Sequence, residues 1–145
     1  SVVYIHSFAF QYCTKLQTVA VPSSVTYLGD AVFQGCTAMT STTIAGSAAV
    51  STNMFQGCTS LLQVTIDSSV PSISDSAAFG GCTKLSMVSI GTGVSNIGES
   101  TFQGCSVLSS AVIPTSVSYI GYRAFQSCAS IAQMLIPTSV VYIHS

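Results

Sequence analysis

The sequence contains very few charged side chains. Its 145 residues include three Lys or Arg and four Asp or Glu, so charged residues make up 5%, against roughly 25% in a typical soluble domain. The net charge of −1 provides no electrostatic surface for nucleic acid or for an anionic membrane, so neither partner is expected. So little surface charge also does little to keep identical copies apart, which favours association.

Long apolar segments are also missing. No apolar run approaches the ~18 residues of a membrane-spanning helix, so membrane insertion is not expected. Nothing at the start resembles a signal peptide, and the sequence opens on Ser1 within a pattern, which suggests a mature product or part of something longer. Hydrophobic residues nevertheless make up 48% of the chain, enough to bury a core. Solubility is then expected from hydroxyl groups, because the chain contains 26 Ser and 15 Thr.

Four columns of residues recur six times with a period of about 23 residues. Each repeat has a Phe, a Cys three residues later, a large aliphatic residue three further on and another aliphatic residue eight after the Cys. The cysteines are spaced by 23, 22, 24, 23 and 23 residues. We call each repeat a rung and number the rungs by their cysteines: Cys13, Cys36, Cys58, Cys82, Cys105 and Cys128. The phenylalanines are Phe10, Phe33, Phe55, Phe79, Phe102 and Phe125. We predict a single array over residues 1–145, with six rungs and the start of a seventh.

Each rung divides into three local patterns. Phe-x-x-Cys-x-x-Leu has apolar residues at i, i+3 and i+6, which is typical of a short helix or 3₁₀ turn. The next four residues alternate with period two and predict a strand. Val-x-x-Ile-Gly, as at residues 117–121, closes several rungs, and its Gly predicts a turn with positive φ. Stacked rungs would form a solenoid with one parallel strand per rung, short helical or 3₁₀ turns on the other side, and buried columns of Phe and Cys.

The second rung departs from the pattern. It is one residue shorter than the period, and Ala48 and Val50 stand near its aliphatic positions, while the third rung is one residue longer. The sequence therefore predicts a weak point in the stack over residues 44–55.

The phrase Ile-Pro-x-Ser-Val-x-x-Ile-Gly-x-x-Ala-Phe-x-x-Cys, at residues 113–128, closely resembles the BspA-type leucine-rich repeat. The likeness covers essentially the whole chain, although the Pro and Gly positions drift in the second to fourth rungs. The resemblance implies a leucine-rich-repeat solenoid. Members of the family look like cell-surface proteins of bacteria and protists, many of them adhesins that bind host or matrix proteins. It therefore implies an extracellular or cell-surface, non-enzymatic role, without identifying a ligand.

The six cysteines have three possible roles. Buried free thiols, packed as small hydrophobic groups, are the favoured interpretation. Disulfides between neighbouring rungs remain possible, because a step of ~5 Å lies within the Cα separation that a bridge spans. A metal site would need clustered ligands such as Cys-x-x-Cys. The sequence has no such cluster, and we predict neither a metal nor a cofactor.

Nothing in the sequence suggests catalysis. His6 and His144 share one position of the repeat, where we expect turn residues facing solvent. Asp30 and Glu99 occupy equivalent columns but lie three rungs apart, roughly 14 Å at ~4.8 Å per rung, too far for either glycosidase geometry. No nucleophile, base and orienting group converge, and the sequence predicts no enzyme.

Two outward columns are candidate contact surfaces. The sheet face consists of uncharged residues at the first outward position of each strand: Thr18, Ser41, Gln63, Met87, Ser110 and Gln133. The tyrosine strip consists of Tyr4, Tyr27, Tyr119 and Tyr142. Tyrosine combines apolar contact area with a hydroxyl, which suits an interface. Ordinary packing of surface aromatics between rungs is the alternative explanation.

One heptapeptide occurs twice. Residues 1–7 and 139–145 both read Ser-Val-Val-Tyr-Ile-His-Ser, at an offset of 138 residues, or six periods of 23. This identity predicts a six-rung super-period with an axial repeat on the order of 29 Å. We therefore expect a structural surface protein whose copies stack end to end, or a longer covalent array, with a filament as the product. The alternative is an adhesin or binding module that recognises surface or matrix proteins through the sheet face or the tyrosine strip.

Overall fold

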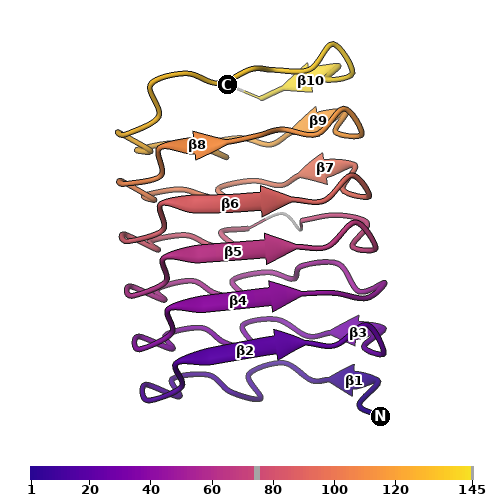
Figure 1. Cartoon of the computed structure of the whole chain (residues 1–145), viewed down its shortest axis with the longest axis vertical. Helices are drawn as coiled ribbons and strands as arrows, with labels where there is room; N and C mark the ends of the chain where they lie inside the picture. Colours follow the sequence, from indigo (N-terminus) through magenta and orange to yellow (C-terminus); the bar gives the residue numbers. More distant parts are fainter. Residues whose placement is uncertain (74–75, 145) are drawn as a thin grey trace.

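The computed structural model describes residues 1–73 and 76–144, which wind upward as a stack of rungs with the two termini at opposite ends (Figure 1). One side of the stack is a five-stranded parallel sheet in the order β2-β4-β5-β6-β8. Its strands are β2 (Thr18–Val21), β4 (Ser41–Ile44), β5 (Gln63–Ile66), β6 (Met87–Ile90) and β8 (Ser110–Ala111).

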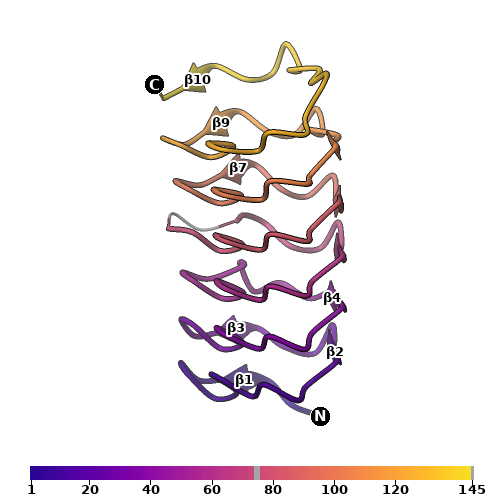
Figure 2. The same ribbon diagram turned by 90° about the vertical axis from the view of Figure 1, so that its left-hand side faces the viewer.

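A second column of two-residue strands runs along another edge of the stack, as Figure 2 shows. These strands are β1 (Tyr4–Ile5), β3 (Tyr27–Leu28), β7 (Asn96–Ile97), β9 (Tyr119–Ile120) and β10 (Tyr142–Ile143). They form two parallel sheets, β1-β3 and β7-β9-β10. Between these sheets the described residues continue the column as isolated bridges, from Val50 to Ile73 and from Ile73 to Ile97. The interruption falls at the irregular second rung.

The repeat period sets the pairing of the strands. Val64 of β5 pairs with Val88 of β6, and Ile66 with Ile90, each 24 residues apart. Because side chains alternate along a strand, these four residues all point into the core while Thr65 faces outward. The prediction of a parallel solenoid built from ~23-residue rungs is confirmed.

The predicted helical or 3₁₀ turns are wrong, because the described residues contain no helix. In the second rung the amide of Phe33 donates to Met54 O, and that of Gly35 to Gln56 O, both at 2.9 Å in the next rung. The intervening amide of Gln34 instead closes a turn within its own rung, donating to Ala31 O at 3.2 Å. Left-handed residues flank each Phe, such as Ala31 and Gly35 with φ of 54° and 70°. They stop each turn from propagating into a helix.

The sixth rung lacks its strand. Residues 132–136 are irregular, and none of their amides donates a backbone hydrogen bond in the described structure. Figure 1 shows this segment standing away from β8. Met134 occupies the inward position that holds Ala111 in the rung below. The larger side chain at this position accompanies the end of the sheet at β8, and Gln133 lies outside the sheet.

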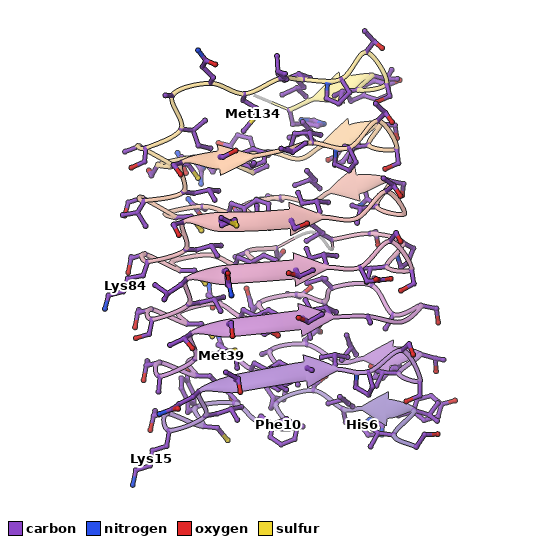
Figure 3. The ribbon with its side chains drawn as sticks, viewed as in Figure 1. His6, Phe10, Lys15, Met39, Lys84 and Met134 are labelled. Carbon is purple, nitrogen blue, oxygen red and sulfur yellow. The ribbon has the colours of Figure 1, made fainter. Side chains whose placement is uncertain are left out.

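The phenylalanines form one continuous stack through the core. Their ring centroids are 5.3 to 5.4 Å apart, and neighbouring rings lie within 20° of parallel. The four inner rings, of Phe33, Phe55, Phe79 and Phe102, are fully buried. The prediction that all six are buried is wrong at the ends: Phe10 is 43% exposed and Phe125 is half-buried. A terminal ring is covered by a neighbouring rung on one side only, and Figure 3 shows Phe10 at the lower end.

The predicted role of the Gly in Val-x-x-Ile-Gly is also wrong. Neither Gly29 nor Gly121 has a positive φ. Each instead lies against the backbone of the rung below: a Cβ at Gly29 would be 2.2 Å from Ser7 N, and one at Gly121 would be 2.6 Å from Glu99 N. Glycine is needed here for the close approach of two rungs.

Amide hydrogen exchange should be faster over residues 44–55 than in the fourth and fifth rungs. Val50 is bridged to one neighbouring rung only, and Ala48 fills less of its rung than the Val or Ile found elsewhere. Local opening should therefore require less free energy there. Exchange followed by mass spectrometry measures this. Full protection of residues 44–55, with fast exchange confined to the terminal rungs, would contradict the prediction.

Candidate interaction surfaces

Serine and threonine hydroxyls bond one rung to the next. Ser24 Oγ donates to Val2 O at 2.7 Å, Ser116 Oγ to Val94 O at 2.6 Å and Ser139 Oγ to Val117 O at 2.8 Å. Thr40, Ser86, Ser95, Ser109, Ser118 and Ser130 make equivalent bonds at other columns. In every case the acceptor lies 22 to 24 residues earlier in the chain. These Ser and Thr hydroxyls therefore join neighbouring rungs of the stack, a role that composition alone did not reveal.

A glutamine ladder runs beside the phenylalanine stack. Gln11 Nε2 donates to Gln34 Oε1 at 2.6 Å, and Gln34 Nε2 donates to Gln56 Oε1 at 2.5 Å. Gly80 replaces glutamine in the fourth rung, and the ladder resumes from Gln103 to Gln126 at 2.5 Å. In the sequence the ladder corresponds to the dipeptide Phe-Gln, which occurs in five of the six rungs. The donors all point the same way along the axis, which gives the stack a polarity.

The cysteine column is made of free thiols. Each Sγ from Cys36 onward donates to the carbonyl of the Phe one rung below, at 3.1 to 3.3 Å. The four inner cysteines are buried, but Cys13 is exposed and Cys128 half-buried, so the prediction of six buried thiols is wrong for the terminal rungs. Burial raises the pKa of Cys58 and of Cys105 from 9.0 to about 12. These inner thiols are therefore unreactive in the folded chain.

The folded state should lose stability as the pH rises above 9. Burial, the largest cause, raises the pKa of Cys58, Cys82 and Cys105 in the fold, whereas the unfolded chain releases these protons near pH 9. The unfolded state then binds fewer protons, so the free energy of unfolding decreases with pH over this range. Denaturant titrations at pH 7 and pH 10 measure the effect. Equal stability at both values would contradict the assigned burial of the thiols.

Thr42 carries a buried hydroxyl without a partner. The side chain points inward from β4, is almost fully buried, and its Oγ1 has no hydrogen bond. Its neighbours in the same column are Val19 of β2 and Val64 of β5. An unpaired buried hydroxyl destabilises the fold.

Replacing Thr42 by valine should stabilise the chain by about 1–2 kcal/mol. Valine has nearly the same shape, continues the valine column and removes the cost of desolvating the hydroxyl. Thermal or denaturant unfolding measures the change. The exposed Thr43→Val, one residue further along β4, serves as the control and should alter stability by less than about 0.5 kcal/mol. An equal gain in both variants would mean that strand propensity, and not the buried hydroxyl, is responsible.

The sheet face is in register over five rungs. Thr18, Ser41, Gln63, Met87 and Ser110 pair consecutively across the parallel sheet, whereas Gln133 lies exposed outside it. A shallow depression crosses β4, β5 and β6, lined by Thr40, Ser41, Leu62, Gln63, Ser86 and Met87. Met87 is 61% and Leu62 is 47% exposed. The surface thus offers apolar contact area between neutral polar groups.

The tyrosine strip consists of two separate pairs. Tyr4 pairs with Tyr27, their ring centroids 6.3 Å apart, and Tyr119 pairs with Tyr142 at the other end of the stack. Ala49, Ser72 and Asn96 occupy the column between them. His6 lies against Tyr27 at 6.0 Å and His144 against Tyr119 at 6.1 Å between ring centroids. Both histidines are exposed, as expected for turn residues.

Charged groups are dispersed over the stack. Lys15 and Lys84 extend outward from one edge (Figure 3), and the Arg123 guanidinium lies 4.5 Å above the Tyr122 ring. Within residues 1–73 and 76–144, no group of three His, Cys, Asp or Glu side chains could hold a metal ion. The same residues include no helix long and apolar enough to cross a membrane.

The stacked parallel strands, the ~23-residue period and the columns of Phe and Cys define a leucine-rich-repeat solenoid. Two solved leucine-rich repeat proteins share this fold with a TM-score of 0.84. One, from Eubacterium ventriosum, is 30% identical over 92% of this chain and 35% of its own. The other, from Bacteroides ovatus, is 31% identical over 96% of this chain and 36% of its own. The chain thus spans about a third of the length of these proteins.

The family is defined by a further match. The model of the BspA type leucine rich repeat region, present in six copies, matches residues 1–77 and 48–145. The chain belongs to this family. It is also similar to a leucine rich cell surface protein of Faecalibacterium prausnitzii, at 25% identity and a TM-score of 0.65 over 96% of this chain and 46% of that one. Comparison with curated proteins finds no match.

Proposed function

We propose that this chain is one 138-residue period of a non-enzymatic scaffold at the cell surface, which grows by continuing its rungs along the axis. The observation that carries the proposal is the heptapeptide found at both 1–7 and 139–145. Ser145 lies outside the described residues, and the other six residues adopt matching positions in the stack. Surface location is supported by the family and by the description of the F. prausnitzii protein.

The two occurrences of the heptapeptide use opposite hydrogen-bonding faces. At the start of the chain its carbonyls accept: Thr26 N donates to Val3 O at 2.9 Å and Gly29 N to Ile5 O at 2.8 Å. At 139–145 its amides donate: Val141 N bonds to Ser118 O at 2.9 Å and His144 N to Ile120 O at 3.1 Å. One heptapeptide with a rung on each side would satisfy both faces, as inner rungs do.

The other columns of residues also have the same phase in the first and sixth rungs. In each lower rung the backbone amide of the stacked Phe donates to a carbonyl of the rung above. Phe102 N, for example, donates to Ala124 O at 2.8 Å. Among residues 1–73 and 76–144, the equivalent amide of Phe125 has no backbone partner, and neither has Ala9 O, the equivalent acceptor in the first rung. A rung built like the first one, placed on the sixth, would pair these groups and continue the phenylalanine stack. Repeat arrays gain stability from each such interface.

A tandem chain tests the proposal. Residues 1–138 are placed directly before the whole 145-residue sequence and the product is alkylated in its native state. A continuous solenoid would bury the Cys13 equivalent of the second copy against the sixth rung of the first, which would lie directly below it. Intact mass should then show one rapidly labelled Cys13-type thiol per molecule, as in the single chain.

A second tandem chain provides the control, with about half a rung of Gly and Ser inserted at the joint to break the phase. It should label two such thiols, because neither copy covers the other in register. Two rapid labels in the direct tandem as well would contradict axial continuation.

Binding through the sheet face is a second candidate, favoured by exposed Met87 and Leu62 around the depression on β4, β5 and β6. In this role the chain is an adhesin for surface or matrix proteins. Met87→Lys should then weaken attachment to cells or matrix by about tenfold without affecting unfolding, whereas Val112→Lys, on the same face outside the depression, should not. Equal attachment of both variants and the unmodified chain would exclude this role.

A further inference from the structure

The glutamine ladder is broken at one inner rung. Gly80 stands in the fourth rung, where the rungs on either side carry Gln56 and Gln103. We propose that this break, formed by Gln56, Gly80, Gly81 and Gln103, is a socket for the side-chain carboxamide of a glutamine on a partner protein. The inference goes beyond the proposed scaffold and does not depend on how the rungs continue along the axis.

An unbroken part of the ladder shows what each member must supply. Gln34 Oε1 accepts a hydrogen bond from Gln11 Nε2 at 2.6 Å, and Gln34 Nε2 donates one to Gln56 Oε1 at 2.5 Å. One carboxamide therefore provides an acceptor toward the rung below and a donor toward the rung above. A carboxylate only accepts and an ammonium only donates, so neither can take this place.

Both requirements are unmet at the break. Among the residues that the structure describes, Gln56 Nε2 donates to no acceptor and Gln103 Oε1 accepts from no donor. The direction of the ladder places Gln56 Nε2 toward the fourth rung from below and Gln103 Oε1 toward it from above. Two rungs separate these side chains, about 10 Å at ~4.8 Å per rung. That is too far for a direct bond and matches the insertion of one carboxamide.

The break has room for a group from outside. A Cβ added at Gly57 or at Gly81 would meet no atom within 4 Å. Gln56 and Gln103 are both half-buried, so the space between them is reached from solvent. A side chain on residue 80 itself would be strained, because its Cβ would lie 2.9 Å from Ala77 Cβ. The chain thus keeps both neighbours of a carboxamide and supplies none of its own there.

The surroundings of the socket suit a peptide better than a free amide. In the first three rungs the Gln, Gly and Thr columns border one shallow hollow, which includes Gln56, Gly57 and Thr37. The same columns continue through Gly81 and the exposed Thr83 beside the socket. The backbone of a bound peptide would lie over the two glycines, while its glutamine side chain enters the ladder. A glutamate of equal size would leave Gln103 Oε1 without a donor, so the socket should discriminate between the two.

Substitutions at residue 80 test the geometry of the socket within the chain. Gly80→Gln should complete the ladder. Gly80→Glu and Gly80→Ala carry the same Cβ contact with Ala77 but cannot donate to Gln103 Oε1. The unfolding equilibrium constant of Gly80→Gln should be about tenfold smaller than that of either control, as expected for one or two hydrogen bonds. Denaturant unfolding measures the difference. If Gly80→Gln is no more stable than both controls, the break does not have the geometry of the ladder and the proposal is wrong.

The unmodified chain tests binding directly, with N-acetyl-Ala-Gln-Ala N-methylamide and its Glu counterpart as probes. In an NMR titration the Gln peptide should shift the side-chain amide resonances of Gln56 and Gln103, with a Kd at least about tenfold lower than that of the Glu peptide. Gln34 already makes both bonds and serves as the internal control, and Gly80→Gln should lose the response. Equal responses to the two peptides, or none, would overturn the proposal. Propionamide should bind more weakly than the Gln peptide. Equal binding of propionamide would assign the socket to small amides and remove the partner protein.

Discussion

Phe55→Ala is expected to lower the free energy of unfolding by about 3–5 kcal/mol, a large share of the stability of a domain of this size. The Phe55 ring is fully buried and stacks on Phe33 and Phe79, with centroids 5.3 Å away on both sides. Truncation removes both stacking contacts and leaves a cavity that the adjacent rungs cannot fill without breaking their backbone hydrogen bonds. Denaturant unfolding followed by circular dichroism measures the loss.

Phe10→Ala is the matched control for this prediction. Phe10 belongs to the same column but stacks on one ring only and is exposed at the end of the chain. Its truncation should cost about 1 kcal/mol, because less apolar surface returns to water. A loss as large as that of Phe55→Ala would show that the stack contributes through ring chemistry rather than through burial.

Gly93→Ala should destabilise the chain by about 3 kcal/mol or more. A Cβ at Gly93 would lie 1.9 Å from Ser68 O and 3.1 Å from Val70 O in the rung below. Both atoms belong to the backbone, so relief requires two hydrogen-bonded rungs to separate, and overpacking of this kind is costly. Thermal unfolding measures the loss, and the intact solenoid signature in circular dichroism at low temperature would show that the fold survives.

Ser116→Ala offers the comparison for Gly93→Ala. Ser116 occupies the same repeat position one rung later. Its variant keeps the Cβ and loses only the hydrogen bond from Oγ to Val94 O, worth about 1 kcal/mol. If the two variants are equally destabilised, the close approach at Gly93 is not what requires glycine there.

The core columns of this protein were predictable from the sequence because they depend on period alone. A side chain placed every 23 residues in a stacked array meets its own equivalent, so Phe33, Phe55, Phe79 and Phe102 had to adjoin one another whatever the local conformation. The inward and outward positions of β5 and β6 followed from the alternation of Val and Ile with polar residues in the same way.

The local conformation around Phe and Cys could not be predicted by the same reasoning. Apolar spacing of three residues suits a helix, but a helix would consume every amide within its own rung. The stack competes for those amides, and Phe33 N and Gly35 N bond to the rung above instead. The amides have these two competing acceptors only when a second rung is present, so the residue pattern within one rung cannot predict which acceptor they use.

The candidate surfaces were predictable to different degrees. The sheet face followed from alternation and holds over five rungs, but residues 132–136, with Met134 above Ala111, lie outside the sheet. Three tyrosines of the strip are exposed and Tyr119 is half-buried. The division of the strip into two pairs follows from Ala49, Ser72 and Asn96 lying between them. The glutamine ladder was present in the sequence as a column and was overlooked because glutamine is equally common on ordinary surfaces.

The sequence by itself determined the number of rungs, their phase and the residues of each core column, because all of these follow from repetition along one axis. Only the tertiary structure decided which groups join one rung to the next. The hydroxyls of Ser24 and Ser116, the thiols of the inner cysteines and the alternate amides all bond to backbone atoms 21 to 27 residues away. The direction of these bonds depends on where two backbones approach each other, which period and composition do not specify.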